Sequence, residues 1–273
     1  RISFRPPPAR GLGADAFLGG GRARGGLSRR AGGNKAMKLL PQFFHSSLGK
    51  KYIMAITGLG MLAFVAVHLA GNLRLFLGPE GLNSYAHGLH RAEEFLWVIR
   101  VCLLVSIGVH VSMAVVLTHE NRAARPIPYE RSRLPGASHA ARTMIWSGLM
   151  VAVFVAYHLL HHSAKAPVSL TGHDFATFRT TLADGTACHD VFRMVVAGFS
   201  QPVVSVFYIV GIGLLCHHLS HGIEAAFQSL GLRNRAWDAA VRKLASGAAW
   251  LLFVGYASIP VAVVCGYGRG ALP

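Results

Sequence analysis

The chain has 273 residues, of which 52% are hydrophobic and only 14% are charged. This composition excludes an ordinary water-soluble domain, in which about a quarter of the residues are charged, and it indicates an integral membrane protein. The formal net charge is +16. Because most lysines and arginines lie in the first 51 residues or in short gaps between apolar segments, we expect this charge to fix membrane topology and expect no nucleic-acid partner.

Residues 1–36 are rich in arginine, glycine, alanine and proline and contain no sustained apolar run. Such a composition is typical of a disordered basic leader. No apolar signal-peptide core appears before Tyr52, so a secretory signal peptide is not expected. We predict a disordered leader over 1–36 and a folded domain over 37–273.

Five apolar segments are long enough to cross a bilayer, which requires about 20 helical residues. We predict transmembrane helices over 52–77, 95–118, 143–161, 195–224 and 244–267. The helix breakers Gly78-Pro79-Glu80-Gly81 predict that the first span ends there and that a loop leads to the second. The expected fold class is therefore all-α, an integral membrane bundle of five helices. The first four are expected to bind a cofactor, and the fifth, which lacks histidine, is expected to be peripheral.

The distribution of charge predicts the orientation of these helices. The leader and the loops 119–142 and 225–243 are basic, whereas the loops 78–94 and 162–193 contain six of the eleven acidic residues. Lysine and arginine concentrate on the cytoplasmic side of membrane proteins. We therefore expect a cytoplasmic N-terminus and an outer C-terminus, which agrees with an odd number of spans.

Each of the first four spans contains histidine, at His68, His110, His158 and the pair His217 and His218. An imidazole is costly in hydrocarbon unless it has a partner, and its neutral ring nitrogen is a good ligand for iron. A single histidine in an apolar helix is more often a hydrogen-bonded core residue. Histidines on four separate spans instead indicate axial ligands for two haem groups.

Two of these histidines are expected near the outer face. The rise of an α-helix is 1.5 Å per residue, which converts sequence position into depth. His68 lies about 25 Å beyond Lys51, and His158 lies about 24 Å beyond Arg142. We therefore predict that His68 and His158 hold one haem together.

The second and fourth spans run in the opposite direction. His110 precedes Arg122 by about 18 Å, and His218 precedes Glu224 by about 9 Å. Both belong nearer the cytoplasm. We predict a second haem between His110 and either His217 or His218, a choice that spacing alone does not make.

Glycines near the histidines could let a flat macrocycle approach the helix backbones. Gly60 and Gly71 flank His68, and Gly211 lies two turns before His218. Such glycines serve equally well in direct helix packing.

Several short motifs follow one another along the chain. They are Gly49-Lys50-Lys51-Tyr52 before the first span, His68-Leu69-Ala70-Gly71-Asn72 within it, Arg100 followed by His110 in the second, Tyr157-His158-Leu159-Leu160-His161 in the third, and His218-Leu219-Ser220-His221-Gly222 in the fourth. Together and in this order, they resemble the di-haem cytochrome b membrane anchor of succinate dehydrogenase and fumarate reductase. The resemblance covers about residues 46–231.

This resemblance implies two haem b groups, ligated by His68, His110, His158 and His218, and its pattern His-Leu-x-His-Gly selects His218 over His217. It implies an electron-transfer subunit of a succinate:quinone oxidoreductase, with no succinate site of its own, in the cytoplasmic membrane of a bacterium. The expected partners are a flavoprotein subunit, an iron–sulfur subunit, membrane lipid and a quinone, for which menaquinone is expected. The scattered cysteines and the lack of a dinucleotide fingerprint agree with catalytic centres on separate chains.

Other polar residues are candidates for contacts with the cofactor or substrate. Cations near a membrane surface can pair with haem propionates, and the candidates are Arg74, Arg100 and Arg193. A quinone that exchanges electrons also exchanges protons, so its pocket needs donors and a titratable group. The outer candidates are Tyr85, His87, His90, Glu93 and Glu94, with the neighbouring Asn83, and the cytoplasmic candidates are Ser46, Ser47, Lys50 and His221.

Two other functions fit the same histidines. A haem-free transporter could use them as a proton relay, and the repeated His-Leu-x-His element at 158 and 218 is a weak sign of an internal repeat. A di-haem cytochrome b of another respiratory complex, such as a formate dehydrogenase or a hydrogenase, would use the same ligands. A visible spectrum tests the first alternative, and the identity of co-purifying subunits tests the second.

Overall fold

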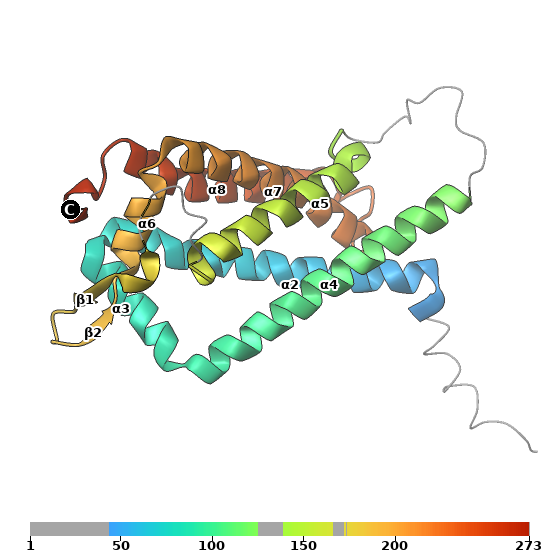
Figure 1. Cartoon of the computed structure of the whole chain (residues 1–273). Coiled ribbons are helices and arrows are strands. Elements are labelled where there is room, and N and C mark those ends of the chain that lie inside the picture. Colours follow the sequence, from blue (N-terminus) through green and yellow to red (C-terminus); the bar gives the residue numbers. More distant parts are fainter. Residues whose placement is uncertain (1–43, 125–138, 166–171, 173, 273) are drawn as a thin grey trace, which may run out of the picture. The chain divides into compact units, whose positions relative to one another are not determined.

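The computed structural model describes residues 44–124, 139–165, 172 and 174–272. In these residues the fold is all-α apart from one small hairpin, and five helices are long and apolar enough to cross a membrane. They are α2 (Ser47–Asn72), α4 (Glu93–Ala123), α5 (His139–His158), α7 (Pro202–Ser229) and α8 (Asp238–Val264) (Figure 1). The predicted fold class and the number of spans are thus confirmed at this level. The predicted leader, 1–36, lies outside the described residues.

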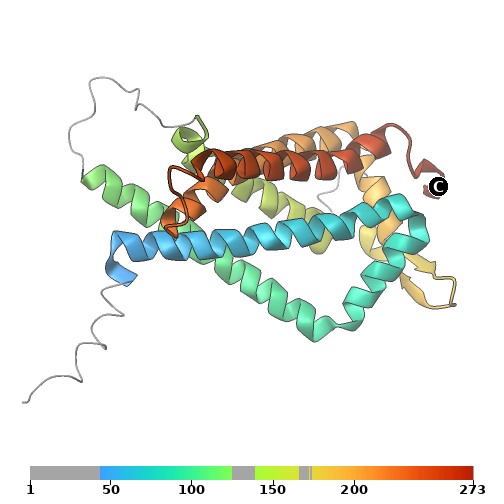
Figure 2. The same cartoon turned by 180° about the vertical axis from the view of Figure 1, so that it is seen from behind.

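Shorter elements gather at one end of the helices, which we call the hairpin end (Figures 1 and 2). They are η1 (Leu73–Leu77), α3 (Gly78–Arg91), the π-helical turn η2 (Leu159–Ser163), η3 (Phe175–Thr177), β1 (Arg179–Thr181), β2 (Ala187–His189), α6 (Val191–Phe199) and η4 (Arg269–Ala271). Strands β1 and β2 pair antiparallel, with Arg179 opposite His189. We call the opposite end, where α2 begins, the Lys50 end.

Two predicted boundaries are wrong. Residues 78–91 form helix α3 rather than a loop. Gly78 turns the chain with a φ of 82°, and Pro79 then occupies the first turn of α3, where a missing N–H costs nothing. The fourth span begins at Pro202 rather than near residue 195. Helix α6 ends at Phe199, and after two intervening residues a separate helix, α7, begins at Pro202.

Helix α7 is the centre of the packing, since it lies against α2, α5 and α8. Helix α8, predicted to be peripheral, runs along α7 and also reaches α2. The Tyr256 hydroxyl donates a 2.6 Å hydrogen bond to the Val65 carbonyl. Gly255 of α8 lets Leu69 of α2 pack closely. A Cβ added to residue 255 would lie only 2.7 Å from Leu69 Cδ2, which is too close.

Helix α4 packs along α2 and, among the described long helices, makes no comparably extended contact with α5, α7 or α8. His110 and His218 therefore lie on two helices, α4 and α7, that are not packed against each other. Much of the surface of α4 is apolar and exposed, at Trp97, Val101 and Leu104 for example. Such a surface is expected of a helix that faces lipid.

At the hairpin end, Asn83 ties α3 to α6. Its side chain is only 2% exposed. Asn83 Nδ2 donates to Asp190 Oδ1 at 3.0 Å, and Asn83 Oδ1 accepts from the Phe192 backbone N–H at 2.9 Å. Asp190 Oδ1 also caps α6 by accepting from the Arg193 backbone N–H at 3.0 Å. Asn83, expected to be part of a quinone pocket, thus has a structural role.

We predict that Asn83→Ala destabilises the protein, because it leaves the buried Phe192 N–H without an acceptor. A buried donor without a partner costs about 1–3 kcal/mol, so the melting temperature in detergent should fall by several degrees. The control is Ser84→Ala, which removes only an exposed bond to the Glu80 carbonyl. Equal melting temperatures for the two variants would contradict this role of Asn83.

Candidate functional site

The structure brings His68 of α2 and His158 of α5 together. Their ring centroids are 6.0 Å apart and their planes make an angle of 80°. Two imidazoles on opposite sides of one metal ion would have centroids about 6 Å apart, because each metal–nitrogen bond is about 2.0–2.1 Å long. The two imidazoles are therefore close enough together to bind one group between them.

Aromatic rings surround the pair. His68 stacks on Phe64 at 5.2 Å and lies 6.3 Å from Tyr256 of α8, while His158 lies 6.2 Å from Phe154 and 6.0 Å from Tyr208. Neither imidazole forms a hydrogen bond with a described residue. Both rings are thus held by packing, and within the part of the chain that the structure describes their nitrogens have no hydrogen-bond partner.

The histidine on α4 is held by hydrogen bonds to α2. His110 Nδ1 lies 3.1 Å from the Met54 carbonyl oxygen and 3.2 Å from Thr57 Oγ1. A carbonyl can only accept, and the Thr57 hydroxyl already donates to the Ile53 carbonyl at 2.8 Å. Nδ1 must therefore carry the proton, which leaves the lone pair of His110 on Nε2.

The same reasoning applies to His218 on α7. Its Nδ1 lies 3.2 Å from Ser147 Oγ of α5, and that hydroxyl donates to the Met144 carbonyl at 3.1 Å. Ser147 therefore accepts from Nδ1, and Nε2 again carries the lone pair. A hydrogen-bonded Nδ1 with a free Nε2 is the usual arrangement of a histidine that ligates a metal.

The two pairs lie at two depths. Thr57, which contacts His110, precedes His68 by eleven residues, and Ser147, which contacts His218, precedes His158 by eleven. Eleven residues of helix span about 16 Å. His110 is also within electrostatic range of His218. His68 and His158 thus lie nearer the hairpin end than His110 and His218 do.

Two glycines that were not predicted to matter, Gly58 and Gly148, lie against the imidazoles of His110 and His218. A Cβ added to Gly58 would lie 3.2 Å from His110 Cε1, and one added to Gly148 would lie 3.3 Å from His218 Cε1. Both contacts are tight. Each glycine directly follows the hydroxyl residue that binds the histidine, a pattern visible in sequence only when the facing helix is known.

The glycines singled out from sequence behave differently. A Cβ at Gly71 would lie 2.7 Å from the Tyr85 hydroxyl, and one at Gly211 would lie 2.3 Å from Phe154 Cδ2. These two serve direct side-chain packing rather than the approach of a macrocycle. An added Cβ at Gly60 meets no atom within 4 Å.

Two further histidines, His161 and His162, extend the group at the hairpin end. His161 is fully buried, and its Nδ1 lies 3.0 Å from the Tyr208 hydroxyl. The ring centroids of His162 and His158 are 5.6 Å apart. His161 Nε2 and His162 Nδ1 are buried without a hydrogen-bond partner among the described residues. Neither histidine was predicted to be part of a site, although three histidines within five residues at the end of a span were a visible signal.

The three arginines proposed for haem propionates each lie over an aromatic ring. The pairs are Arg74 over Tyr85 at 4.7 Å, Arg100 over Trp97 at 5.1 Å and Arg193 over Phe178 at 4.5 Å. Arg74 and Arg100 are exposed, as expected of side chains that extend to the membrane surface. Arg193 is half-buried, belongs to α6, and has a buried Nε without a partner.

The outer quinone candidates do not converge on one pocket. Tyr85 packs on α2 beside Gly71, and the Nδ1 of the exposed His90 lies 2.8 Å from the Ala86 carbonyl. His87 is two residues beyond Tyr85, which places the two side chains on different faces of α3. The remaining candidates, Glu93 and Glu94, are exposed in the first turn of α4.

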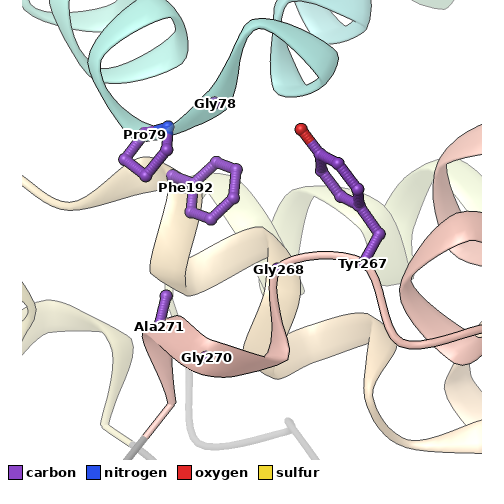
Figure 3. Close-up of a pocket in the computed structure, with 7 residues that line it drawn as sticks. All are labelled: Gly78, Pro79, Phe192, Tyr267, Gly268, Gly270 and Ala271. Carbon is purple, nitrogen blue, oxygen red and sulfur yellow. The ribbon is translucent and has the colours of Figure 1, made fainter.

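An open cavity of about 500 Å³ lies nearby, between the start of α3, α6 and the glycine-rich turn near the C-terminus (Figure 3). The rings of Phe192 and Tyr267 line it, together with backbone of Gly78, Gly268 and Gly270. The Tyr267 hydroxyl already donates to the Leu75 carbonyl at 3.0 Å. No carboxylate or histidine lines this cavity, so it lacks a group for proton exchange with a quinone.

Two of the four candidates at the Lys50 end, Lys50 and Ser46, have structural partners. Lys50 forms an ion pair with Glu120 of α4. Ser46 caps α2 by accepting from the Gly49 backbone N–H at 2.9 Å. His221 is half-buried, three residues beyond His218 on the same helix.

Comparisons of the chain with protein-family models, curated proteins and solved structures found no match. Within the described residues, no three His, Cys, Asp or Glu side chains are close enough to hold a metal ion. An iron bound by either pair would need further ligands, and the nitrogens of a porphyrin supply them in a haem.

We predict that Gly211→Ala destabilises the protein, because its Cβ would overlap Phe154, which packs beside His158. Overpacking of this kind costs about 1–3 kcal/mol. The control is Gly213→Ala, whose Cβ makes an ordinary contact 3.6 Å from Phe253. Thermal melting in detergent should show a loss for Gly211→Ala alone, and equal losses would count against this packing.

Proposed function

We propose that the chain is a membrane-anchor cytochrome b that holds two haem b groups. In this proposal it carries electrons between a quinone pool and the flavoprotein and iron–sulfur subunits of a succinate dehydrogenase or fumarate reductase. The observation that supports it best is the occurrence of two histidine pairs, on four helices, at two depths. The partner subunits and the reaction rest on the resemblance of the sequence motifs.

His68 and His158 would hold the outer haem, and His110 and His218 the inner one. A haem iron takes up and releases one electron at a time. The protein would fix the ligand rings, by aromatic packing in the outer pair and by hydrogen bonds at Nδ1 in the inner pair. A hydrogen bond from Nδ1 also makes Nε2 a stronger ligand.

The spacing of the pairs suits transfer across a membrane. The two layers are separated by about 16 Å along the helices, and the hydrocarbon core of a bilayer is about 30 Å thick. One pair would therefore lie in each half of the core. The N-terminus would face the cytoplasm, where the basic loops and the soluble subunits would lie.

We predict that four alanine variants fall into two classes in reduced-minus-oxidised visible spectra. His68→Ala and His158→Ala should each remove the same b-type component, and His110→Ala and His218→Ala the other. His217→Ala is the matched control and should keep both, because its Nε2 contacts Thr143 at 3.2 Å. Loss of a shared component by His68→Ala and His110→Ala would contradict the pairing.

One observation favours a second candidate, a haem-free transporter with a proton relay. Imidazoles follow one another from His68 to His158 at 6.0 Å, to His162 at 5.6 Å and to His161 at 4.2 Å, and His161 reaches Tyr208. A purified protein without a Soret band would favour this reading. A haem-containing protein that co-purifies with a formate dehydrogenase or a hydrogenase would instead identify a different respiratory complex.

On the sequence resemblance alone, we also propose that the quinone reacts on the same side as His68 and His158. Glu93 and Glu94, which lie at the surface of α4 and not in a pocket, would exchange its protons. The double variant Glu93→Gln, Glu94→Gln should then lower quinone-linked turnover about 100-fold, the smaller contribution expected of general acid–base catalysis. Succinate oxidation by an artificial dye, which bypasses the quinone, should be unchanged. If Ser47→Ala or His221→Ala selectively abolishes the quinone reaction instead, the site lies at the Lys50 end.

A further inference from the structure

Phe178, between η3 and β1, is surrounded by basic side chains. The Arg193 guanidinium carbon lies 4.5 Å from the centroid of its ring. The Phe178 carbonyl oxygen accepts from His189 Nδ1 at 2.8 Å and from Arg179 Nη1 at 3.1 Å. Lys165, just beyond η2, is within electrostatic range of His189 and Arg179. These four basic residues, which we call the Phe178 cluster, come from separate segments of the chain.

Two nitrogens of the Phe178 cluster, Nε of Arg193 and Nε2 of His189, are buried without a hydrogen-bond partner among the described residues. A guanidinium N–H can only donate, so Arg193 needs an acceptor. Leaving a buried charged donor without a partner is costly, and natural proteins seldom do so without a reason. His189 Nδ1 donates to the Phe178 carbonyl, so Nε2 of the neutral ring carries a lone pair. The buried N–H of Arg193 is therefore the group that points to a ligand with acceptor oxygens.

The charge of the cluster is poorly compensated by nearby residues. Burial and the Arg179 guanidinium lower the pKa of Lys165. Burial and the Lys165 ammonium likewise lower the pKa of His189, against an opposing effect of Asp190. Asp190 Oδ1 already accepts hydrogen bonds from Asn83 and from the backbone of α6. Asp190 is thus already committed to the contact between α3 and α6.

We infer that the Phe178 cluster binds an oxyanion, a phosphate or carboxylate group, of a molecule held in the membrane. The oxyanion would accept from Arg193 Nε and pair with Lys165, and such charge-assisted hydrogen bonds are the strong ones. Lys165 lies two residues after the candidate span Thr143–Ser163 and Arg193 nine residues before the candidate span Pro202–Ser229, and basic residues that flank membrane spans can meet lipid headgroups. The inference goes beyond the proposed electron transfer, because the cluster needs no haem in order to form.

Two molecules can present this group here. One is an anionic phospholipid, whose phosphate lies at the membrane surface. The other is the outer haem of the proposed function, through a propionate. Ring contacts connect the cluster with the histidines, from Phe178 to Phe175 at 5.8 Å and from Phe175 to His161 at 5.4 Å. The experiment must therefore separate the two sources.

The first arm measures lipid binding by the full chain in detergent. Short-chain phosphatidylglycerol should raise the melting temperature at concentrations where phosphatidylcholine does not. Arg193→Gln and Lys165→Gln should weaken the apparent affinity about tenfold or more, since each removes a charged partner. The control Arg91→Gln, which removes an exposed cation at the same end, should behave as wild type. This arm works equally on haem-free protein, so it remains informative if the haem proposal fails.

The second arm measures the midpoint potential of the haem that His68→Ala removes. A shift in Arg193→Gln and Lys165→Gln, but not in Arg91→Gln, identifies the propionate as the oxyanion. If phosphatidylglycerol acts alike on all variants and the potential moves in none, the Phe178 cluster binds no oxyanion and the inference is wrong. Should Arg193→Gln fail to fold, Lys165→Gln, which lies outside any helix, decides both arms.

Discussion

The cost of placing imidazole rings in hydrocarbon is the constraint on which the rest of this structure depends. An apolar bundle has little to offer a polar ring, so each histidine must be packed, hydrogen-bonded or bound to a ligand. His110 and His218 meet this requirement through hydrogen bonds from Nδ1 to acceptors on the facing helices α2 and α5. His68 and His158 meet it by packing against aromatic rings and against each other. In both pairs at least one nitrogen remains for a ligand.

The helices contribute differently to holding these histidines in place. Helix α7 packs against three others and holds α5 and α2 in place, while α4 packs along α2 alone among the described long helices. His110 is nevertheless fixed, because Met54 and Thr57 bind its ring. The hairpin end closes the bundle through Asn83 and Asp190, whose hydrogen bonds connect α3 with α6.

Periodicity and length were sufficient to predict five helices that are long and apolar enough to cross a membrane, and helical rise was sufficient to predict that His68 and His158 lie together. The failures have physical causes. Gly78 and Pro79 end one helix but also suit the start of the next, and sequence does not separate these two uses. Thr57 and Ser147 went unnoticed because each acts on a histidine more than 50 residues away. The Phe178 cluster is formed by a hairpin and a short helix, and hydrophobic periodicity in the sequence does not predict how these two elements are arranged.

The central claim is that the two histidine pairs each hold one haem. Its most direct test is the haem content of the purified full chain, measured by conversion of the bound haem to its pyridine complex and by quantitative amino-acid analysis of the same sample. The account predicts two haem b groups per chain, which titrate as two components in a redox titration. A chain that is folded, as judged by its helical circular dichroism, and yet contains no haem after expression with ample haem supply would contradict it.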